Sequence, residues 1–214
     1  MSETYLANRV RGPFNATAFW LLDGVLDRTM RARKRRIFDG LPAEVVELGP
    51  GVGANLRYLS VNTKLIAVEP NPAMHARLSK RAHQAGIQLD LRGVVGEKLD
   101  LPDASADAVI SSLVLCTVQD PERVVAEVLR VLRPGGRYAF LEHVIAPEGS
   151  RLRQIQHLVR RPWAWSFEGC SCERDLAAVI ERAGFGELQI ERYRLRSPFL
   201  PINTQIAGVA VKAT

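Results

Sequence analysis

Residues 44–55, EVVELGPGVGAN, combine an acid with three closely spaced glycines and form the stretch best suited to bind a ligand. Gly49, Gly51 and Gly53 stand at alternate positions, where a backbone without Cβ atoms can turn tightly and approach a flat or anionic group. The apolar run before the glycines predicts a buried strand, and the residues after them predict a helix with free N–H groups at its start. The pattern therefore predicts a ligand-binding turn between a strand and a helix.

The choice of ligand depends on an acid. The spacing of Gly49, Gly51 and Ala54 also fits the looser dinucleotide fingerprint, with Glu69 placed to bind a ribose at the end of the next apolar run. Nicotinamide cofactors and S-adenosylmethionine both present an adenosine to such a site. Glu47 would repel a pyrophosphate, whereas it would hold the cationic α-amino group of S-adenosylmethionine. We therefore predict S-adenosylmethionine as the cofactor, with S-adenosylhomocysteine as the product.

His143 is the candidate for proton transfer. It lies at the C-terminal end of an apolar run expected as a strand over 137–145, at the edge where doubly wound sheets place their ligands. An imidazole accepts protons near neutral pH, so we predict that His143 is catalytic; the alternative is a structural histidine bonded to the backbone. Strand alternation points Glu142 and His143 to opposite faces, so we expect only one of them to face the pocket.

Residues 146–171 form a long insertion that contains Trp163 and Trp165. Long connections of this kind are often binding loops or lids, and aromatic side chains suit an apolar substrate. We therefore predict that both tryptophans contact substrate; the alternative is that they only pack the insertion onto the sheet.

The three cysteines give no clear metal motif. Cys170 and Cys172 form C-x-C, but Cys116 is the only other cysteine and no histidine pair stands nearby. We therefore predict that no metal is bound. Cys116 has the character of a small core residue, and it is also placed with Cys170 among the candidate substrate-binding residues.

Two sets of motifs resemble known families. The first resembles the class I S-adenosylmethionine-dependent methyltransferases, in the branch with the ubiquinone-type C-methyltransferases, over about residues 43–145. It consists of ELGPGVG at 47, VEPNP at 68, GEKLDLP at 96 and EVLRVLRPGG at 127. A second set resembles the methyltransferase-like 7 proteins, which are thiol S-methyltransferases, and extends to about residue 186. It adds SLVLCTV at 112, LEHV at 141 and W-x₃-F-x-G-C at 163–170. The long hydrophobic anchor of those relatives has no counterpart in this N-terminal sequence.

The resemblance implies roles for individual positions. The cofactor-binding set implied around the methionine, ribose and adenine is Glu47, Gly49, Pro50, Gly51, Gly53, Asn55, Glu69, Pro70, Asn71, Gly96, Glu97, Lys98 and Leu113. The implied acceptor is a small apolar thiol or sulfide. A C-, O- or N-methyltransferase of a quinone, lipid or natural-product intermediate stays open, as does a non-catalytic adenosylmethionine-binding subunit. A nicotinamide-dependent oxidoreductase is the weakest alternative, because Glu47 is misplaced for it.

The elements needed to position these residues alternate between strands and helices. We predict an α/β fold with a doubly wound, Rossmann-like, mostly parallel sheet, and the resemblance implies seven strands in the order 3-2-1-4-5-7-6 with the last antiparallel. Residues 41–214 would form this domain. Residues 1–40 would supply an amphipathic helix that starts at Asn15 after a break at Gly12–Pro13 and ends in a basic cluster.

The basic residues are concentrated in one segment. The chain has 29 basic and 23 acidic residues, and six of the basic ones lie in residues 28–36 without an acid between them. The remainder is balanced, so a nucleic-acid partner is not expected. The helix would act as a lid with a solvated basic end, or residues 15–38 would contact an anionic membrane surface. The sequence lacks a signal-like first segment and an apolar membrane span, and its odd cysteine number suits a reducing compartment, so we expect a cytoplasmic protein.

Overall fold

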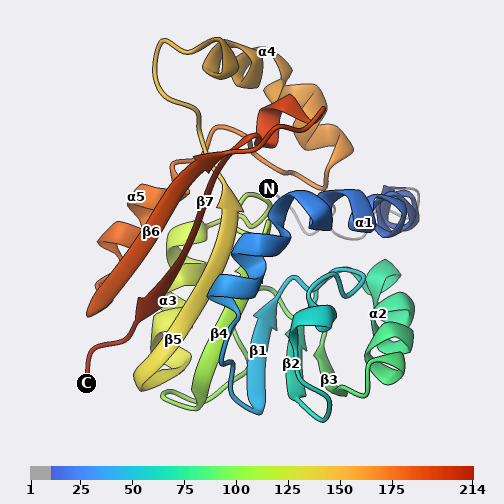
Figure 1. Ribbon diagram of the computed structural model, residues 1–214, viewed down its shortest axis with the longest axis vertical. Helices are drawn as coiled ribbons and strands as arrows, with labels where there is room; N and C mark the ends of the chain where they lie inside the picture. The colour runs from blue at the N-terminus through green and yellow to red at the C-terminus, as the bar shows by residue number, and fades with distance from the viewer. Residues whose placement is uncertain (1–10) are drawn as a thin grey trace.

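Seven strands form one sheet in the computed structural model, which describes residues 11–214 (Figure 1). Their order is β3-β2-β1-β4-β5-β7-β6, and β7 is antiparallel to both β5 and β6 whereas the other pairs are parallel. The strands are β1 (Glu44–Leu48), β2 (Lys64–Val68), β3 (Gln88–Arg92), β4 (Ala106–Ser112), β5 (Leu132–His143), β6 (Glu187–Arg194) and β7 (Thr204–Val211). This architecture confirms the predicted fold class.

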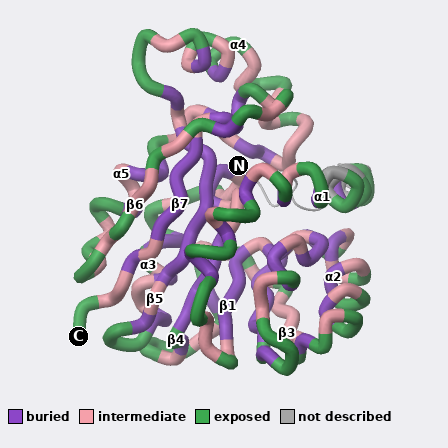
Figure 2. Tube along the Cα trace, viewed as in Figure 1, coloured by how far each residue is buried: buried purple, intermediate pink, exposed green. Residues whose placement is uncertain are grey.

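Helices cover both faces of the sheet. On one face, α1 (Arg11–Ile37) and α2 (Pro72–Gln84) bury Met30 and Leu78 against strand residues such as Leu65. On the other, α3 (Pro121–Val131) and α5 (Leu176–Arg182) bury Val128 and Ile180 with the inward side chains of β4 and β5. The central strands are accordingly buried along most of their length, whereas the helices expose their outer faces (Figure 2). Burial on both faces explains the nearly continuous apolar runs of β1 and β4.

A polar residue directly before a proline predicts a helix start at each of two positions, before Pro72 and before Pro121, and both helices begin there. Asn71 caps α2 by accepting a hydrogen bond from the Ala73 N–H, and Asp120 caps α3 by accepting one from the Arg123 N–H. A proline follows each cap, where its missing N–H costs the helix nothing. These caps fix where the chain leaves the C-terminal ends of the strands.

Two local predictions were wrong, and one helix was missed. The glycine-rich turn is followed by a single 3₁₀ turn, η2 (Leu56–Tyr58), rather than a helix. The chain must enter β2 at Lys64, and Asn62 already adopts a left-handed φ of 66°, so little length remains for helical turns. Helix α1 begins before Gly12–Pro13, because proline is tolerated in a first turn. The insertion over 146–171 contains a helix, α4 (Arg151–Ser166), which the sequence analysis did not predict.

One buried polar side chain attaches α4 to the sheet. Gln156 is fully buried, its Oε1 accepts from the Ala146 N–H at 2.8 Å, and its Nε2 donates to the carbonyls of Val144 at 3.1 Å and Pro201 at 2.9 Å. These bonds connect α4 to the end of β5 and to the short 3₁₀ helix η3 (Leu200–Ile202). The insertion therefore has a defined position above the sheet (Figure 1).

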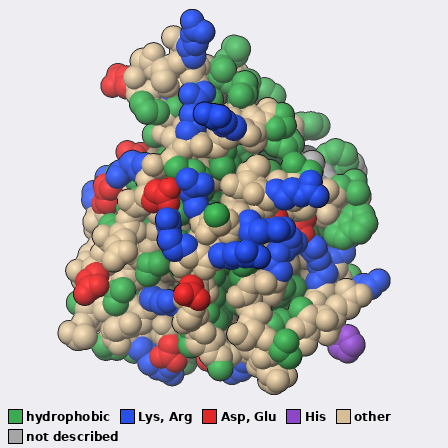
Figure 3. Space-filling model, in the orientation of Figure 1, with side chains coloured by type: hydrophobic (Ala, Val, Ile, Leu, Met, Phe, Trp, Pro, Cys, Tyr) green, Lys and Arg blue, Asp and Glu red, His purple; other side chains and the backbone are tan. Residues whose placement is uncertain are grey.

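Helix α1 packs on the domain, and its basic end is not simply solvated. Lys34 is 4% exposed, and Arg33 and Arg36 both pair with Glu191 of β6. Other Lys and Arg side chains gather on the face that α1 crosses (Figure 3). Part of the expected apolar stripe faces outward, since Leu21 is 66% exposed. Within residues 11–214, no helix has both the length and the hydropathy needed to cross a membrane.

Candidate active site

A cavity of about 550 Å³ lies at the C-terminal ends of β1, β2 and β4. Nine residues of the predicted cofactor set line it: Gly49, Pro50, Gly51, Asn55, Glu69, Pro70, Gly96, Glu97 and Leu113. Four others, Glu47, Gly53, Asn71 and Lys98, do not line it. Helix α1 supplies a further wall that includes Asp27, Met30 and Lys34. The topology thus brings most of the predicted positions to one cavity.

A buried chain of polar groups runs along this wall. The Lys34 ammonium donates to Asn55 Oδ1 at 2.7 Å, and Asn55 Nδ2 donates to Glu47 Oε1 at 2.8 Å. Glu47 is fully buried directly behind Asn55, and its Oε2 has no hydrogen-bond partner among the described residues. Burial raises the pKa of Glu47 to about 7, although Asn55 and the Lys34 charge oppose the shift. The array places Lys34 and Asn55 on the cavity wall, with the Glu47 carboxylate directly behind Asn55.

The acid after β2 connects two loops. Glu69 is buried, and its two oxygens accept from the N–H groups of Gly51 and Asn71, each at 2.9 Å. Gly51 adopts a φ of 56°, which turns its N–H toward this carboxylate. Burial raises the pKa of Glu69, and the two backbone hydrogen bonds oppose that shift. The carboxylate holds the glycine-rich turn against the start of α2.

The remaining predicted cofactor-binding positions differ from one another. Glu97 lines the cavity, and its Oε1 accepts from the Gln119 N–H at 2.7 Å. Lys98 is exposed and lies outside the cavity. Gly53 has a packing role, because a Cβ there would lie 2.6 Å from Leu56. Asn71 contributes through its backbone and through Nδ2, which donates to Glu168 of the insertion at 2.7 Å.

The chain after β4 makes a strained turn that Glu142 supports. Leu113 has a φ of 60°, a conformation that L side chains rarely adopt. The carboxylate of Glu142 accepts from the N–H groups of Val114 and Leu115 at 3.0 and 3.2 Å and from the Ser111 hydroxyl at 2.9 Å. Burial raises the pKa of Glu142 to about 7. Glu142 therefore shapes the pocket wall, whereas its neighbour His143 points elsewhere.

A second pocket, of about 90 Å³, adjoins the first. The two pockets share Leu26, Leu113, Thr117 and Phe167, so a group in one can approach a group in the other. The walls of the second pocket are otherwise mainly apolar, with Trp163, Phe199 and Ile202 among them. It contains the predicted substrate residues Cys116, Trp163 and Cys170; Trp165 is 64% exposed and lies outside it.

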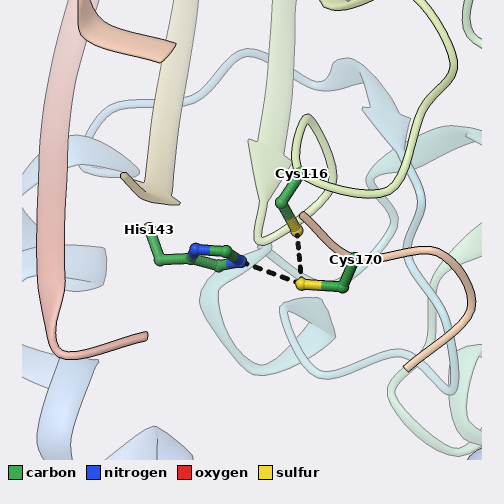
Figure 4. Close-up of side chains that lie close together, drawn as sticks. All are labelled: Cys116, His143 and Cys170. Atoms are coloured by element: carbon green, nitrogen blue, oxygen red, sulfur yellow. Dashed lines mark hydrogen bonds between the residues drawn. The ribbon is translucent and has the colours of Figure 1, made fainter. Parts of the chain in front are cut away.

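Cys116, His143 and Cys170 form a cluster in this second pocket, with all three side chains pointing toward one another (Figure 4). His143 Nε2 lies 3.1 Å from Cys170 Sγ, and Cys116 Sγ lies 3.4 Å from the same sulfur. The Trp163 indole N–H donates to Cys170 Sγ at 3.3 Å. Cys172, the other half of the C-x-C pair, contacts the Gln156 carbonyl instead.

The cluster perturbs its own ionisation. The hydrogen bond from Cys116, with the imidazole of His143 adding to it, holds the pKa of Cys170 well below its usual range in spite of burial. The same hydrogen bond and burial raise the pKa of Cys116. Burial alone would lower the pKa of His143, but the Cys170 sulfur more than offsets it, so the net pKa is raised. Cys170 is therefore the group in this cluster that most readily carries negative charge.

Four contributors were missed by the sequence analysis. Lys34 was counted only in a charge run, Glu142 was treated as the alternative to His143, and Glu168 was not considered. The fourth was the cluster itself, in which His143 and Cys116 approach Cys170 from 27 and 54 residues away in sequence. The motifs EHV and FEGC contain His143 and Cys170, but no rule of residue spacing predicts that these two side chains meet.

Comparisons with known proteins agree with this geometry. The methyltransferase domain family matches residues 46–140. The chain is 38% identical over 197 residues to "Thiol S-methyltransferase TMT1B" of Mus musculus, covering 86% of this chain and 80% of the relative. It is 32% identical over 200 residues to "Thiol S-methyltransferase TMT1A" of Homo sapiens, covering 88% and 82%.

Solved structures support the fold. A phosphoethanolamine N-methyltransferase 2 of Haemonchus contortus, in complex with phosphomonomethylethanolamine and S-adenosylhomocysteine, superimposes with a TM-score of 0.73 at 14% identity. That match covers 100% of this chain and 61% of the other. The sequence matches show that the chain belongs to the S-adenosylmethionine-dependent methyltransferases, in the family of the thiol S-methyltransferases TMT1A and TMT1B, and the structural match agrees with that fold.

Proposed function

We propose that this protein transfers the methyl group of S-adenosylmethionine to the sulfur of a small apolar thiol or sulfide. The observation that carries the proposal is the second pocket, which meets the larger cavity at Leu113 and Phe167 and has sulfur and imidazole groups in an apolar wall. Its volume of about 90 Å³ suits a small acceptor better than a quinone or a lipid. The names of the two relatives support the same acceptor class.

The residues around the larger cavity fit the cofactor. S-adenosylmethionine supplies an electrophilic methyl group on a sulfonium. Lys34 and the Glu47–Asn55 pair complement the carboxylate and the ammonium of its amino-acid end, and Glu47 Oε2 is a buried acceptor without a partner among residues 11–214. Glu69 keeps lone pairs for the ribose hydroxyls, since each of its oxygens accepts one hydrogen bond from the described part of the chain. Pro70, Gly96 and Glu97 border the space for adenine.

The acceptor must lose its proton, because a thiolate is the nucleophile. His143 Nε2, at 3.1 Å from Cys170 Sγ, lines the proposed acceptor pocket and is the group we propose to take this proton, directly or through Cys170. Trp163 and Phe167, whose ring centroids lie 4.3 Å apart, would exclude water and orient the acceptor toward the cofactor. The reaction needs little else, since methyl transfer is a single in-line displacement.

The cysteines also support a location. Cys116, Cys170 and Cys172 are all free and buried, which suits a reducing compartment, and we propose that the protein works in the cytoplasm.

Two measurements test the proposed function. Calorimetric titration of S-adenosylmethionine tests cofactor binding, and methyl transfer from labelled cofactor is then compared across thiols including hydrogen sulfide, phenols and amines. Turnover of thiols alone is the expected result. Turnover confined to phenols, amines or carbon acceptors would exclude the thiol assignment, and tight binding without any turnover would favour a non-catalytic binding subunit. His143→Ala that retains thiol turnover with an unchanged pH profile would exclude its role as the proton acceptor.

A further inference from the structure

We propose that Cys116, His143 and Cys170 bind a zinc ion whose remaining coordination position takes the sulfur of the acceptor. This inference rests on the proposed thiol methylation and deepens it, and it replaces the sequence-based prediction that no metal is bound. Two thiolates and one imidazole with an open fourth position form a ligand set typical of catalytic zinc. Nothing in the linear spacing of these residues indicated the site.

The geometry is close to what zinc requires. The ligand atoms Cys116 Sγ, His143 Nε2 and Cys170 Sγ all lie within 4.8 Å of one another. Tetrahedral bonds of about 2.3 Å to sulfur and 2.0 Å to nitrogen imply ligand-to-ligand distances of about 3.5 to 3.8 Å. The measured 3.1 Å between Nε2 and Cys170 Sγ and 3.4 Å between the two sulfurs need only a few tenths of an ångström of expansion.

The backbone already fixes the two cysteines beside each other. The Ser171 N–H donates to the Cys116 carbonyl at 2.8 Å, which joins the end of the insertion to the loop after β4. His143 is the last residue of β5, so its position is set by the sheet. The Trp163 N–H at 3.3 Å from Cys170 Sγ provides the kind of second hydrogen bond that orients a metal-bound thiolate. Little conformational entropy therefore remains to be lost when an ion binds.

Charge and burial favour occupation by a soft divalent cation. All three side chains are buried, and two thiolates in this apolar surrounding would be costly without compensation. A zinc ion with two thiolates and a neutral imidazole is electrically neutral. Thiolate and imidazole ligands select zinc over the hard cations Mg²⁺ and Ca²⁺, which prefer oxygen.

The open position would face the acceptor. Cys116, His143 and Cys170 all border the pocket of about 90 Å³ that adjoins the cofactor cavity. An acceptor thiol that coordinates the ion there loses its proton to solvent, since coordination strongly favours the thiolate. A sulfur lone pair then forms the new bond to the methyl carbon, and the breaking carbon–sulfur bond returns its electrons to the sulfonium to give S-adenosylhomocysteine. The thioether product is neutral, binds zinc more weakly and leaves.

Metal binding changes the role of His143. Its Nε2 cannot coordinate zinc and accept the acceptor proton at the same time, so in the metal-bound protein the ion, not the imidazole, generates the nucleophile. The two roles are distinguishable because one requires metal and the other does not.

The test is a metal titration of the full chain, tag-free and kept reduced. The protein is loaded with Zn²⁺ or Co²⁺, freed of excess ion by gel filtration and analysed by elemental mass spectrometry. We expect one ion per chain, and with Co²⁺ the absorption of a tetrahedral site with thiolate ligands. Cys116→Ser, Cys170→Ser and His143→Ala should each lose the ion. Cys172→Ser is the matched control, since Cys172 is also buried but lies outside the cluster, and it should retain the ion.

Titration with S-adenosylmethionine distinguishes a variant that is misfolded from one that has lost only the metal site. The variants should bind S-adenosylmethionine as the wild type does, because the groups proposed to bind it directly lie outside the metal-ligand set. Chelation should lower kcat for thiols by about 10- to 100-fold, and Zn²⁺ should restore it. The inference is overturned if reduced wild type holds no stoichiometric ion, if the Cys116→Ser/Cys170→Ser variant holds as much, or if complete metal removal leaves kcat for thiols unchanged. Stoichiometric metal without thiol turnover would instead overturn the proposed function and leave the metal site standing.

Discussion

The ionisation of Glu47 should control cofactor affinity. Glu47 is fully buried, bonded by Asn55 at 2.8 Å and without a partner on Oε2 among the described residues, and burial raises its pKa to about 7. A cationic ammonium nearby favours the carboxylate, so binding should lower this pKa. Affinity for S-adenosylmethionine is therefore fully present above pH 7 and is lost as pH falls toward the pKa of the bound state. Lys34→Met should make this loss of affinity begin at a higher pH, because the Lys34 charge favours the ionised form of Glu47.

The magnitude follows from the fraction ionised. With a pKa of about 7, roughly one tenth of Glu47 is ionised at pH 6, so the dissociation constant should be about tenfold weaker than at its plateau, ~1.4 kcal/mol. The free α-amino group of the cofactor itself loses its proton near pH ~8, which limits affinity on the alkaline side. We expect the tightest binding between these two values. Glu47→Gln should remove the fall in affinity at acid pH. It should also weaken binding at pH 8 by about 10- to 100-fold, because a charged hydrogen bond is lost.

The same substitution should stabilise the cofactor-free protein. A carboxyl whose pKa rises from 4.5 to about 7 on folding contributes stability below pH 4.5 that is lost as pH rises through 7. The difference corresponds to about 3 kcal/mol, so Glu47→Gln should raise the free energy of unfolding at pH 8 by up to that amount.

Calorimetry in buffers of different ionisation heat and thermal unfolding measure the two effects. At pH 6.5 wild type should release most of a proton on binding, and Glu47→Gln none. Glu44→Gln is the control, since Glu44 lies on the same strand but its side chain is 39% exposed and pairs with Lys64. Unchanged affinity and proton release in Glu47→Gln would refute the reasoning.

Three further predictions concern the turn, the insertion and the lid helix. Gly49→Ala should lower the melting temperature and weaken cofactor binding more than Gly40→Ala does: both have positive φ, but only at Gly49 would a Cβ lie 2.7 Å from a valine side chain. Equal effects would mean that backbone strain alone is responsible. Trp163→Ala should lower kcat/KM for apolar thiols by about tenfold (~1.4 kcal/mol). Trp165→Ala, at an exposed position, should leave it nearly unchanged, and equal losses would contradict the pocket assignment. If residues 15–38 contact membranes, vesicles with anionic lipid should float the protein and neutral vesicles should not; no lipid dependence would rule this contact out.

The sequence predicted those parts of the protein that local patterns determine. The strands followed from apolar runs, their order was implied by the family resemblance, and the caps Asn71 and Asp120 followed from polar residues before prolines. Helix α4 escaped prediction because a key inward residue, Gln156, is polar and because Pro162 lies within it. A helix was predicted after Gly53 because the periodicity of apolar residues does not show how few residues remain before the next strand.

The candidate site was also predictable only in part. Contiguous motifs predicted most of the positions that line the larger cavity, from Gly49 to Leu113. Lys34 was missed because a run of basic residues normally points to solvent, and only the packing of α1 buries this one. The contacts among Cys116, His143 and Cys170 depend on how the insertion folds back over the sheet, and residue spacing contains no such information.

The attachment of α4 through Gln156 makes this helix an exchangeable part of the enzyme. The three hydrogen bonds of this one side chain connect the helix to positions 144, 146 and 201 without involving the larger cavity. The cofactor half can therefore stay constant while the helix that contributes Trp163 diverges. If α4 is transferred between relatives with Gln156 retained, the acceptor preference should be transferred with it. New acceptors can then evolve while the residues proposed to bind the methyl donor stay unchanged.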